Sequence, residues 1–261
     1  MPTNATPHTG ALTPVVLARN LVALAWTVLC FLLVAVVAIG SAGLLAAPLA
    51  STFPRLWGRT VLAILGVRVT LVGEERLADI RTGRVGSSWP CVLVTNHQST
   101  LDVPLAGLLG PRYPLVMGKA ELRYLPVFNL LWWAIGQRFV ERGNRESARA
   151  TVDAFVRALR RHPRAVLLAP EGTRTLDGTV GPFKRGAFRI AAEAQVPIVP
   201  FTIEGAFELM PRGRGWCPPG EVRLTVRAPI DTTGWRAEDA GTHADAVRER
   251  FVAWLAPPAP S

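Results

Sequence analysis

The chain is poor in the residues that build disulfide frameworks and metal centres. Its 261 residues include three cysteines and four histidines, all widely separated along the sequence. Disulfide-rich folds and structural zinc sites use closely spaced sets of these residues, and no such spacing occurs here. We therefore expect a fold held together by its hydrophobic core, without a structural metal.

Charged residues are also scarce, and they are unequal in sign. Asp, Glu, Lys and Arg make up 18% of the chain, against 49% hydrophobic residues, and the formal net charge is +10. This composition excludes a disordered polar protein and a supercharged nucleic-acid arm. We expect the positive charge to attract anionic lipid headgroups. We expect no nucleic-acid partner, because no recognition motif or aromatic platform accompanies the charge.

The longest stretch without charge lies near the N-terminus. Residues 21–50 contain no Asp, Glu, Lys, Arg or His. As one straight helix they would extend about 45 Å, which exceeds the hydrocarbon core of a bilayer at about 30 Å. The helix therefore tilts, or it breaks at Gly40, Ser41, Gly43 or Pro48.

Two interpretations of this stretch stay open. One is a single membrane span over about residues 15–39, and the other is a hairpin within one leaflet whose second arm includes residues 53–65. A cleaved signal peptide fits poorly because residues 1–18 lack the basic start, and a buried core helix rarely runs so far without a charge. We favour the hairpin, which would place Trp57 at the membrane interface and keep the N-terminus on the side of the remaining chain.

Residues 66–256 are predicted to form one α/β domain. Before it we expect disordered residues 1–13 and membrane-associating helices in residues 14–65, and after it a disordered tail of residues 257–261. Apolar runs alternate with amphipathic stretches, which predicts a mixed, mostly parallel sheet covered by helices on both faces. The expected strands are 67–72, 91–95, 114–117, 137–140, 165–169, 196–203 and 222–227, and the expected helices are 99–109, 147–161, 185–194 and 244–255.

A polar cluster, residues 96–102 (NHQSTLD), follows the expected buried strand 91–95. Sites in α/β sheets lie at such strand ends. His97 and Asp102 are separated by a strand-to-helix turn, across which the carboxylate can orient the imidazole as a general base. The cluster also matches a capping box, with Ser99 as N-cap and Asp102 reaching back. Ser99 ranks low as a nucleophile, because it lacks the glycine-flanked turn that exposes a hydrolase serine.

A second polar cluster, residues 170–175 (PEGTRT), follows the expected strand 165–169. Gly172 permits close backbone approach, and Arg174 can bind a phosphate through two N–H groups. Lys184 adds a second cation near the start of an expected helix. These features predict an anion site. The alternative is a solvated turn, since an Asp-Gly pair follows.

Two further stretches, residues 136–142 (GQRFVER) and 196–200 (VPIVP), complete an ordered set. With NHQSTLD and PEGTRT, they resemble in sequence order the four blocks of the glycerolipid acyltransferase family, and most of all its bacterial 1-acyl-glycerol-3-phosphate acyltransferases. Residues 118–126 also resemble the basic segment between the first two blocks of that family. The resemblance covers about residues 61–228, and four blocks in one order make a chance match very improbable.

The resemblance implies a role for each matched residue. His97 would be the general base and Asp102 its partner. Contacts with the phosphate and glycerol of an acceptor are implied for Arg142, Glu171, Gly172, Thr173, Arg174 and Lys184. The sequence departs from the family at Ala169, where an aromatic residue is usual, and at Asn129, where glycine is common. These departures leave the preferred acceptor open. The resemblance implies no metal and no bound cofactor.

The implied activity moves a fatty acyl group from an acyl thioester, acyl-CoA or acyl-carrier protein, to the sn-2 hydroxyl of 1-acyl-glycerol-3-phosphate, giving phosphatidic acid. One alternative is another acceptor, such as glycerol 3-phosphate or a lyso-ornithine lipid. An alternative of another class is a catalytically idle, basic membrane-binding protein, against which the intact blocks argue. The implied partners are membrane lipids, the lysophospholipid acceptor and the acyl donor, whereas the acyl chain preference and the oligomeric state stay open.

The expected location is the bacterial inner membrane, with the catalytic domain on the cytoplasmic face. Acyl thioesters are cytoplasmic substrates, so the site has to face that side. Arg55, Arg59 and Arg68 follow the apolar stretch, and Arg19 alone precedes it, which agrees with a cytoplasmic downstream side.

Overall fold

The computed structural model describes residues 11–42, 44–83, 89–111, 114–124, 129, 132, 137–140 and 145–256. The ends predicted to be disordered, residues 1–13 and 257–261, lie outside this part except for residues 11–13, which precede the first helix. The predicted site residue Arg142 also lies outside the described residues.

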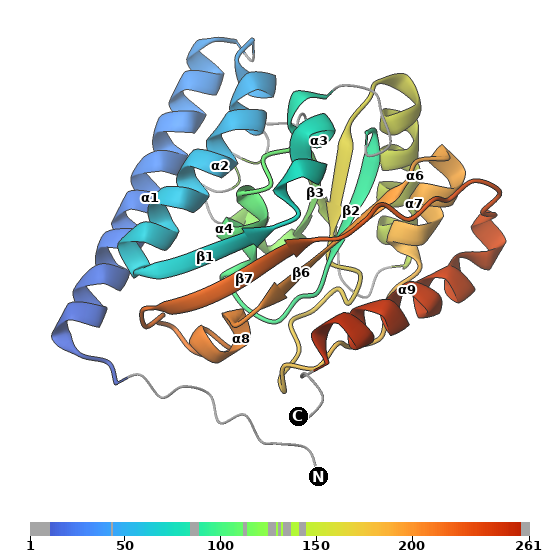
Figure 1. Ribbon diagram of the computed structural model, residues 1–261. Helices are drawn as coiled ribbons and strands as arrows, with labels where there is room; N and C mark the ends of the chain where they lie inside the picture. The colour runs from blue at the N-terminus through green and yellow to red at the C-terminus, as the bar shows by residue number, and fades with distance from the viewer. Residues whose placement is uncertain are drawn as a thin grey trace.

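Seven strands of the described chain form one mixed sheet (Figure 1). They are β1 (Val67–Val72), β2 (Cys91–Thr95), β3 (Pro114–Lys119), β4 (Arg138–Val140), β5 (Ala165–Leu168), β6 (Ile198–Glu204) and β7 (Gly220–Val226). Their order across the sheet is β1-β7-β6-β2-β5-β3-β4. Neighbouring strands are parallel except β6 and β7, which are antiparallel. The predicted strands and the mostly parallel sheet are confirmed.

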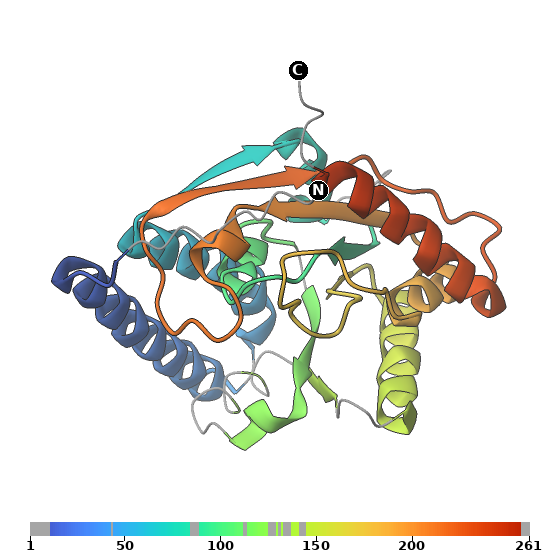
Figure 2. The same cartoon turned by 90° about the horizontal axis from the view of Figure 1, so that it is seen from below.

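Helices cover both faces of this sheet. The longer helices are α1 (Pro14–Gly40), α2 (Ala46–Leu65), α6 (Arg145–Arg161), α7 (Gly186–Ala194) and α9 (Ala240–Leu255). The shorter ones are η1 (Glu74–Leu77), α3 (Ala78–Thr82), α4 (Asp102–Gly107), η2 (Ala120–Tyr124), α8 (Ala206–Leu209) and η3 (Ala237–Asp239). Figures 1 and 2 show α1 and α2 at one side of the molecule and α6, α7 and α9 at the other.

Strand β2 shows how a short apolar run builds two cores. All five of its residues are buried. Successive side chains of a strand point to opposite faces, so Cys91 and Leu93 pack with α2 and α4, whereas Val92 and Val94 pack with α6, α7 and α9. A strand buried on both faces favours apolar residues, and the one polar residue of β2, Thr95, stands at its last position. The polar residues therefore begin where the strand ends, and that end carries the site.

Helices α1 and α2 form an antiparallel hairpin (Figure 1). Trp26 Nε1 donates to Thr60 Oγ1 at 2.8 Å, and Trp57 Nε1 donates to Thr27 Oγ1 at 3.2 Å. The residue number rises along α1 from Trp26 to Thr27 while that of the partner on α2 falls from Thr60 to Trp57, as expected for antiparallel helices. The turn between the helices lies at the small residues that were predicted to break the apolar stretch.

Helix α1 is the one helix of the described chain that is long and apolar enough to cross a membrane. Apart from Arg19 near its start, its outward side chains are mostly apolar and exposed along its length; they include Val15, Leu21, Leu24, Leu29, Leu33, Val36 and Ile39. A continuous exposed apolar face of this kind is an interaction surface rather than a water-facing one. Association with a membrane through α1 follows from this face.

Helix α2 packs closely on α4 through two glycines. A Cβ on Gly58 would lie 2.4 Å from the carbonyl oxygen of Pro104, and a Cβ on Gly107 would lie 2.5 Å from that of Pro54. Only residues without a side chain allow the two backbones to approach so closely. Helix α2, which ends at Leu65, therefore packs directly against the α/β domain that was predicted to begin at residue 66.

The first turns of α1 also lie against the α/β domain. The Asn20 side-chain amide donates to the carbonyl oxygen of Cys217 at 2.9 Å and accepts the Cys217 N–H at 2.8 Å. A single span would separate this end of α1 from the domain by the thickness of a bilayer. The hydrogen-bonded arrangement therefore favours the hairpin over the span.

The depth of Trp57 in the membrane stays a prediction, and the structure shows that protein covers its side chain. Its side chain is 9% exposed and packs in one aromatic cluster with Phe31 and Phe53. The indole can be buried here because Thr27 accepts its one hydrogen-bond donor, so no unpaired polar group accompanies the large apolar ring.

Candidate active site

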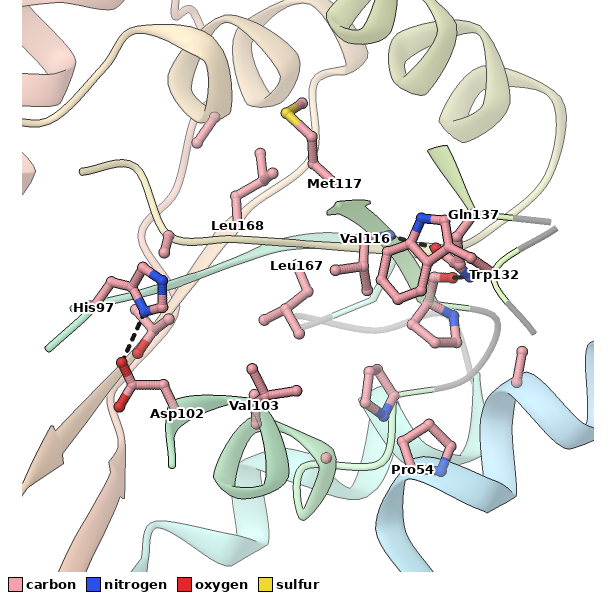
Figure 3. A pocket seen from close by; sticks show the side chains of 18 of the residues that line it. Pro54, His97, Asp102, Val103, Val116, Met117, Trp132, Gln137, Leu167 and Leu168 are labelled. Atoms are coloured by element: carbon pink, nitrogen blue, oxygen red, sulfur yellow. Dashed lines mark hydrogen bonds and ion pairs between the residues drawn. The ribbon is translucent and has the colours of Figure 1, made fainter. Parts of the chain in front are cut away.

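The turn after β2 brings His97 and Asp102 together, as predicted. His97 Nδ1 lies 2.8 Å from Asp102 Oδ2 (Figure 3). Because Nδ1 faces the carboxylate, Nε2 is the ring nitrogen that is left for a substrate hydroxyl. The carboxylate is almost fully buried and the imidazole is partly exposed, so solvent and substrate reach the ring but not its partner. This is the geometry of a general base with an orienting carboxylate.

Asp102 also forms one half of the predicted capping box, although Leu101 and not Ser99 is the N-cap of α4. Its Oδ2 accepts the backbone N–H groups of Gln98 at 2.8 Å and Ser99 at 3.0 Å. The Leu101 N–H donates to Ser99 Oγ at 3.1 Å, and Ser99 Oγ donates to the Met210 carbonyl oxygen at 2.8 Å. The two interpretations are thus compatible, because one carboxylate holds both the turn and the imidazole. The Ser99 hydroxyl serves the turn.

Glu171 joins the PEGTRT loop to the catalytic turn. Its Oε1 accepts the His97 N–H at 2.7 Å, and its Oε2 accepts the Gly181 N–H at 3.0 Å. Burial raises the pKa of Glu171, and the two backbone hydrogen bonds oppose that rise. The Thr175 N–H adds a link to the His97 carbonyl oxygen at 3.2 Å. Glu171 therefore braces the backbone of the base, and its predicted contact with an acceptor stays a prediction.

Lys184 places a positive charge in the cavity wall beside the base, next to Gly172. Gly172 has a φ of +70°, and a Cβ at this position would lie 2.5 Å from Lys184 Nζ. Glycine both adopts this conformation without strain and leaves room for the ammonium group. Gly172 and Lys184 line the same cavity as His97. An anionic group bound near His97 would therefore meet a cation.

The remaining predicted residues lie at the edge of the site or outside the described chain. The Arg174 guanidinium donates through Nη1 to the Thr100 hydroxyl, which belongs to the catalytic turn. Thr173 is exposed. Neither Arg174 nor Thr173 lines the cavity, and Arg142 is not among the described residues. The acceptor contacts predicted for these three residues stay predictions.

A cavity of about 470 Å³ opens beside His97. Figure 3 shows apolar side chains around it, among them Val103, Leu167 and Trp132. Its volume lies within the roughly 300–1,000 Å³ that is usual for small-molecule sites. The cavity is polar at the histidine and mostly apolar elsewhere, so it suits a long apolar group with a reactive polar end.

The far wall of this cavity was not predicted from the sequence. Phe31 of α1 and Phe53 of α2 line it, although both lie in the segment interpreted as membrane-associating. Gln137 also lines it; its side chain accepts the Val116 N–H at 2.7 Å and donates to the Pro114 carbonyl oxygen at 2.9 Å. These residues come together only through the packing of the hairpin and of β3, which no local pattern shows.

Asn96 is another residue whose role was not predicted from the sequence. Its amide donates to the Ile203 carbonyl oxygen and accepts the Ile203 N–H, both at 2.9 Å. These bonds fix the end of β2 against β6, immediately before the base. A signal existed, because an Asn that directly follows a buried strand has to find partners for its amide.

Within the described ranges, no group of three or more His, Cys, Asp and Glu side chains could hold a metal ion. The three cysteines are free, and Cys91 and Cys217 are buried. The site as described therefore consists of a histidine, carboxylates, a lysine and backbone groups.

Comparison with known proteins places this arrangement among acyltransferases. The sequence profile of the acyltransferase family matches residues 68–204. A Saccharomyces cerevisiae 1-acyl-sn-glycerol-3-phosphate acyltransferase is 32% identical over 191 residues, which is 72% of this chain and 60% of that protein. The Mus musculus 1-acyl-sn-glycerol-3-phosphate acyltransferase alpha is 32% identical over 203 residues, or 75% of this chain and 70% of that protein. The chain thus spans less than two thirds of the length of the yeast relative.

A solved structure shows the same fold. The crystal structure of the 1-acyl-sn-glycerophosphate acyltransferase PlsC from Thermotoga maritima aligns with a TM-score of 0.62 at 25% sequence identity. The alignment covers 91% of this chain and 97% of that chain.

Proposed function

Because the chain belongs to the acyltransferase family, as the match over residues 68–204 shows, we propose that it acylates 1-acyl-glycerol-3-phosphate at the sn-2 hydroxyl, giving phosphatidic acid. The acyl donor is an acyl thioester, either acyl-CoA or acyl-carrier protein. One observation carries the proposal, namely the His97–Asp102 pair at the polar end of an apolar cavity. The names of the relatives support the choice of acceptor.

In the proposed reaction, His97 Nε2 removes the proton from the sn-2 hydroxyl. The oxygen attacks the thioester carbonyl carbon, and the carbon–sulfur bond breaks as the ester forms. The thiolate leaves with the proton that His97 carried. Asp102 fixes the tautomer of the ring and stabilises the imidazolium. No acyl-enzyme is needed, since a thioester is already activated and the Ser99 hydroxyl is committed to the turn.

Recognition of the acceptor follows from the cations beside the base. Lys184 lies over Gly172 in the cavity wall, and Arg174 lies at the catalytic turn. We assign the acceptor phosphate to these two side chains and to Arg142. Binding of the phosphate holds the sn-2 hydroxyl next to the imidazole. The loss of translational and rotational entropy then occurs on binding and not in the chemical step.

The apolar cavity is the proposed site for an acyl chain. Its walls come from the hairpin, from α4 and from β3 and β5. An acyl chain in this cavity would be removed from water, and burial of each methylene group contributes about 0.8 kcal/mol. The hairpin would then serve both the membrane and the substrate.

We place the protein on the cytoplasmic face of the bacterial inner membrane, held by the α1–α2 hairpin in one leaflet. Support comes from the apolar face of α1, from the contact of Asn20 with the α/β domain, and from the arginines that follow the apolar stretch. The N-terminus then lies on the cytoplasmic side.

Acceptor profiling of the purified protein tests the proposal. The assay supplies radiolabelled acyl-CoA or acyl-carrier protein together with lysophosphatidic acid, glycerol 3-phosphate or lyso-ornithine lipid. We expect phosphatidic acid as the main product. Preference for another acceptor would show that the protein is an acyltransferase for that acceptor and not for lysophosphatidic acid. Absence of transfer to every acceptor would support the idle membrane-binding alternative.

A further inference from the structure

The loop between α8 and β7, residues 210–219 and here called the connector, joins α1 to the catalytic turn. Near one end, Cys217 exchanges two backbone hydrogen bonds with the Asn20 side chain of α1, at 2.9 and 2.8 Å. At the other end, the Met210 carbonyl oxygen accepts the Ser99 hydroxyl at 2.8 Å. Figure 2 shows this loop beside α1. The connector therefore starts at the catalytic turn and ends at the membrane helix.

The connector is basic and aromatic, with the sequence MPRGRGWCPP and no acidic residue. The Arg214 guanidinium donates to the carbonyl oxygens of Glu208 and Leu209 at 3.2 and 3.1 Å, and it lies 4.9 Å from the centroid of the Trp216 ring. These contacts fix the loop. Arg212 lies in the exposed part of the loop, and Trp216 is half-buried. The proposed reaction uses neither side chain.

The charges around the connector favour an anionic ligand. Residues 1–73 contain four arginines and no Asp or Glu, and exposed Arg19 lies next to Asn20. Of the acidic residues that flank the connector, Glu221 pairs with Arg68 at 2.7 Å. Glu208 lies two residues before the connector, and Arg19 adjoins Asn20, the residue of α1 that binds the connector.

We propose that the connector is a second membrane contact, which docks on anionic phospholipid headgroups through Arg212 and Trp216. The proposal rests on the proposed membrane location of α1. Asn20 holds the connector beside Leu17 and Leu21, whose apolar side chains are 45% and 56% exposed. Basic residues next to an apolar membrane face bind anionic headgroups, and Trp is enriched at that depth. Acceptor lipids at this surface would lie beside the catalytic turn.

A fluorescent probe in the connector tests this contact. Gly215 has open space around it, so a Gly215→Cys variant accepts an environment-sensitive dye. Burial raises the pKa of the Cys217 thiol to about 12, and Cys91 is fully buried, so a Cys30→Ala background directs labelling to residue 215. The labelled full-length protein is reconstituted into phosphatidylcholine vesicles with and without phosphatidylglycerol.

We expect the dye to shift to the blue and to be protected from an aqueous quencher in vesicles that contain phosphatidylglycerol. Arg212→Glu should reduce the docked-to-free ratio about 25-fold, because the change alters the charge by two units at about fivefold each. Arg250→Glu, on the exposed face of α9, is the matched control and should leave the ratio unchanged. A dye that stays accessible to the quencher in both vesicles would overturn the proposal.

Kinetic measurements on the unlabelled protein distinguish a failure of this proposal from a failure of the proposed function. Arg212→Glu should raise the apparent KM for long-chain lysophosphatidic acid in anionic vesicles and leave turnover of a water-soluble short-chain acceptor unchanged. A variant that instead loses saturation by acyl-carrier protein would show that the connector binds an acidic protein, and the membrane contact would be wrong. Absence of all acyl transfer would refute the proposed function, and the dye result would still decide the connector.

Discussion

Replacement of Arg174 should affect binding of the acceptor and binding of the donor differently. Arg174→Ala should raise the acceptor KM by about 10- to 100-fold, the value of one lost hydrogen bond between charged groups, with a smaller effect on the donor KM. Arg174→Lys should not restore it, because an ammonium group lacks the fork geometry of a guanidinium. Steady-state kinetics with each substrate varied in turn measure both constants. An effect on the donor alone would reverse the assignment of the two subsites.

The buried carboxyl group of Glu171 should make the stability of the protein depend on pH. Its folded-state pKa is raised by burial, so between the ordinary glutamate pKa and the raised one the folded protein binds more protons than the unfolded chain. Stability should therefore fall as the pH rises through this interval. Glu171→Gln should remove that slope, and Glu249→Gln, at an exposed position, should keep it. Urea denaturation across pH measures the slope; an equal slope in all three proteins would contradict the assignment.

Single residues also show where the sequence predicted the site and where it did not. His97, Asp102 and Gly172 lie around one cavity, because they follow the ends of buried strands that local apolar runs define. Lys184 lines the same cavity from the start of α7. Glu171 is nearby, but it binds backbone N–H groups, a role that sequence spacing does not reveal.

At the scale of elements, the contact between α2 and α4 depends on two glycines. Gly58→Ala would place a methyl group 2.4 Å from the Pro104 carbonyl oxygen, so the helices would have to move apart. We expect a loss of about 1–3 kcal/mol in the free energy of unfolding, as for other overpacked contacts. Gly40→Ala is the control, since nothing lies within 4 Å of a Cβ there. Denaturant unfolding in detergent measures both; equal stabilities would show that α2 docks less tightly than described.

The elements themselves were largely predictable. Strands 67–72 and 91–95 were predicted with the bounds that β1 and β2 have, because β-branched and apolar runs stop abruptly at glycine or polar residues. The hairpin was predicted as a membrane element, but its second helix is part of the domain core. Hydropathy reports how apolar a helix is, and it cannot report whether lipid or protein covers the apolar face.

At the scale of the whole molecule, the contact of Asn20 with Cys217 predicts the topology of the N-terminus. A cysteine near residue 5, in a variant without the native thiols, should not react with a membrane-impermeant thiol reagent in intact cells. The reason is that the start of α1 lies on the same side as the α/β domain. Permeabilised cells provide the positive control. Labelling in intact cells would mean that α1 spans the membrane, and the hairpin placement would be abandoned.

We propose that His97, oriented by Asp102, is the base that activates the acceptor hydroxyl. Turnover of lysophosphatidic acid by His97→Ala, compared with the native protein under saturating acyl thioester, tests this role. We predict a loss of about 10²- to 10⁴-fold, the usual contribution of a general base, with vesicle binding and the unfolding transition unchanged. Near-normal turnover by a folded, membrane-bound His97→Ala protein would contradict the account.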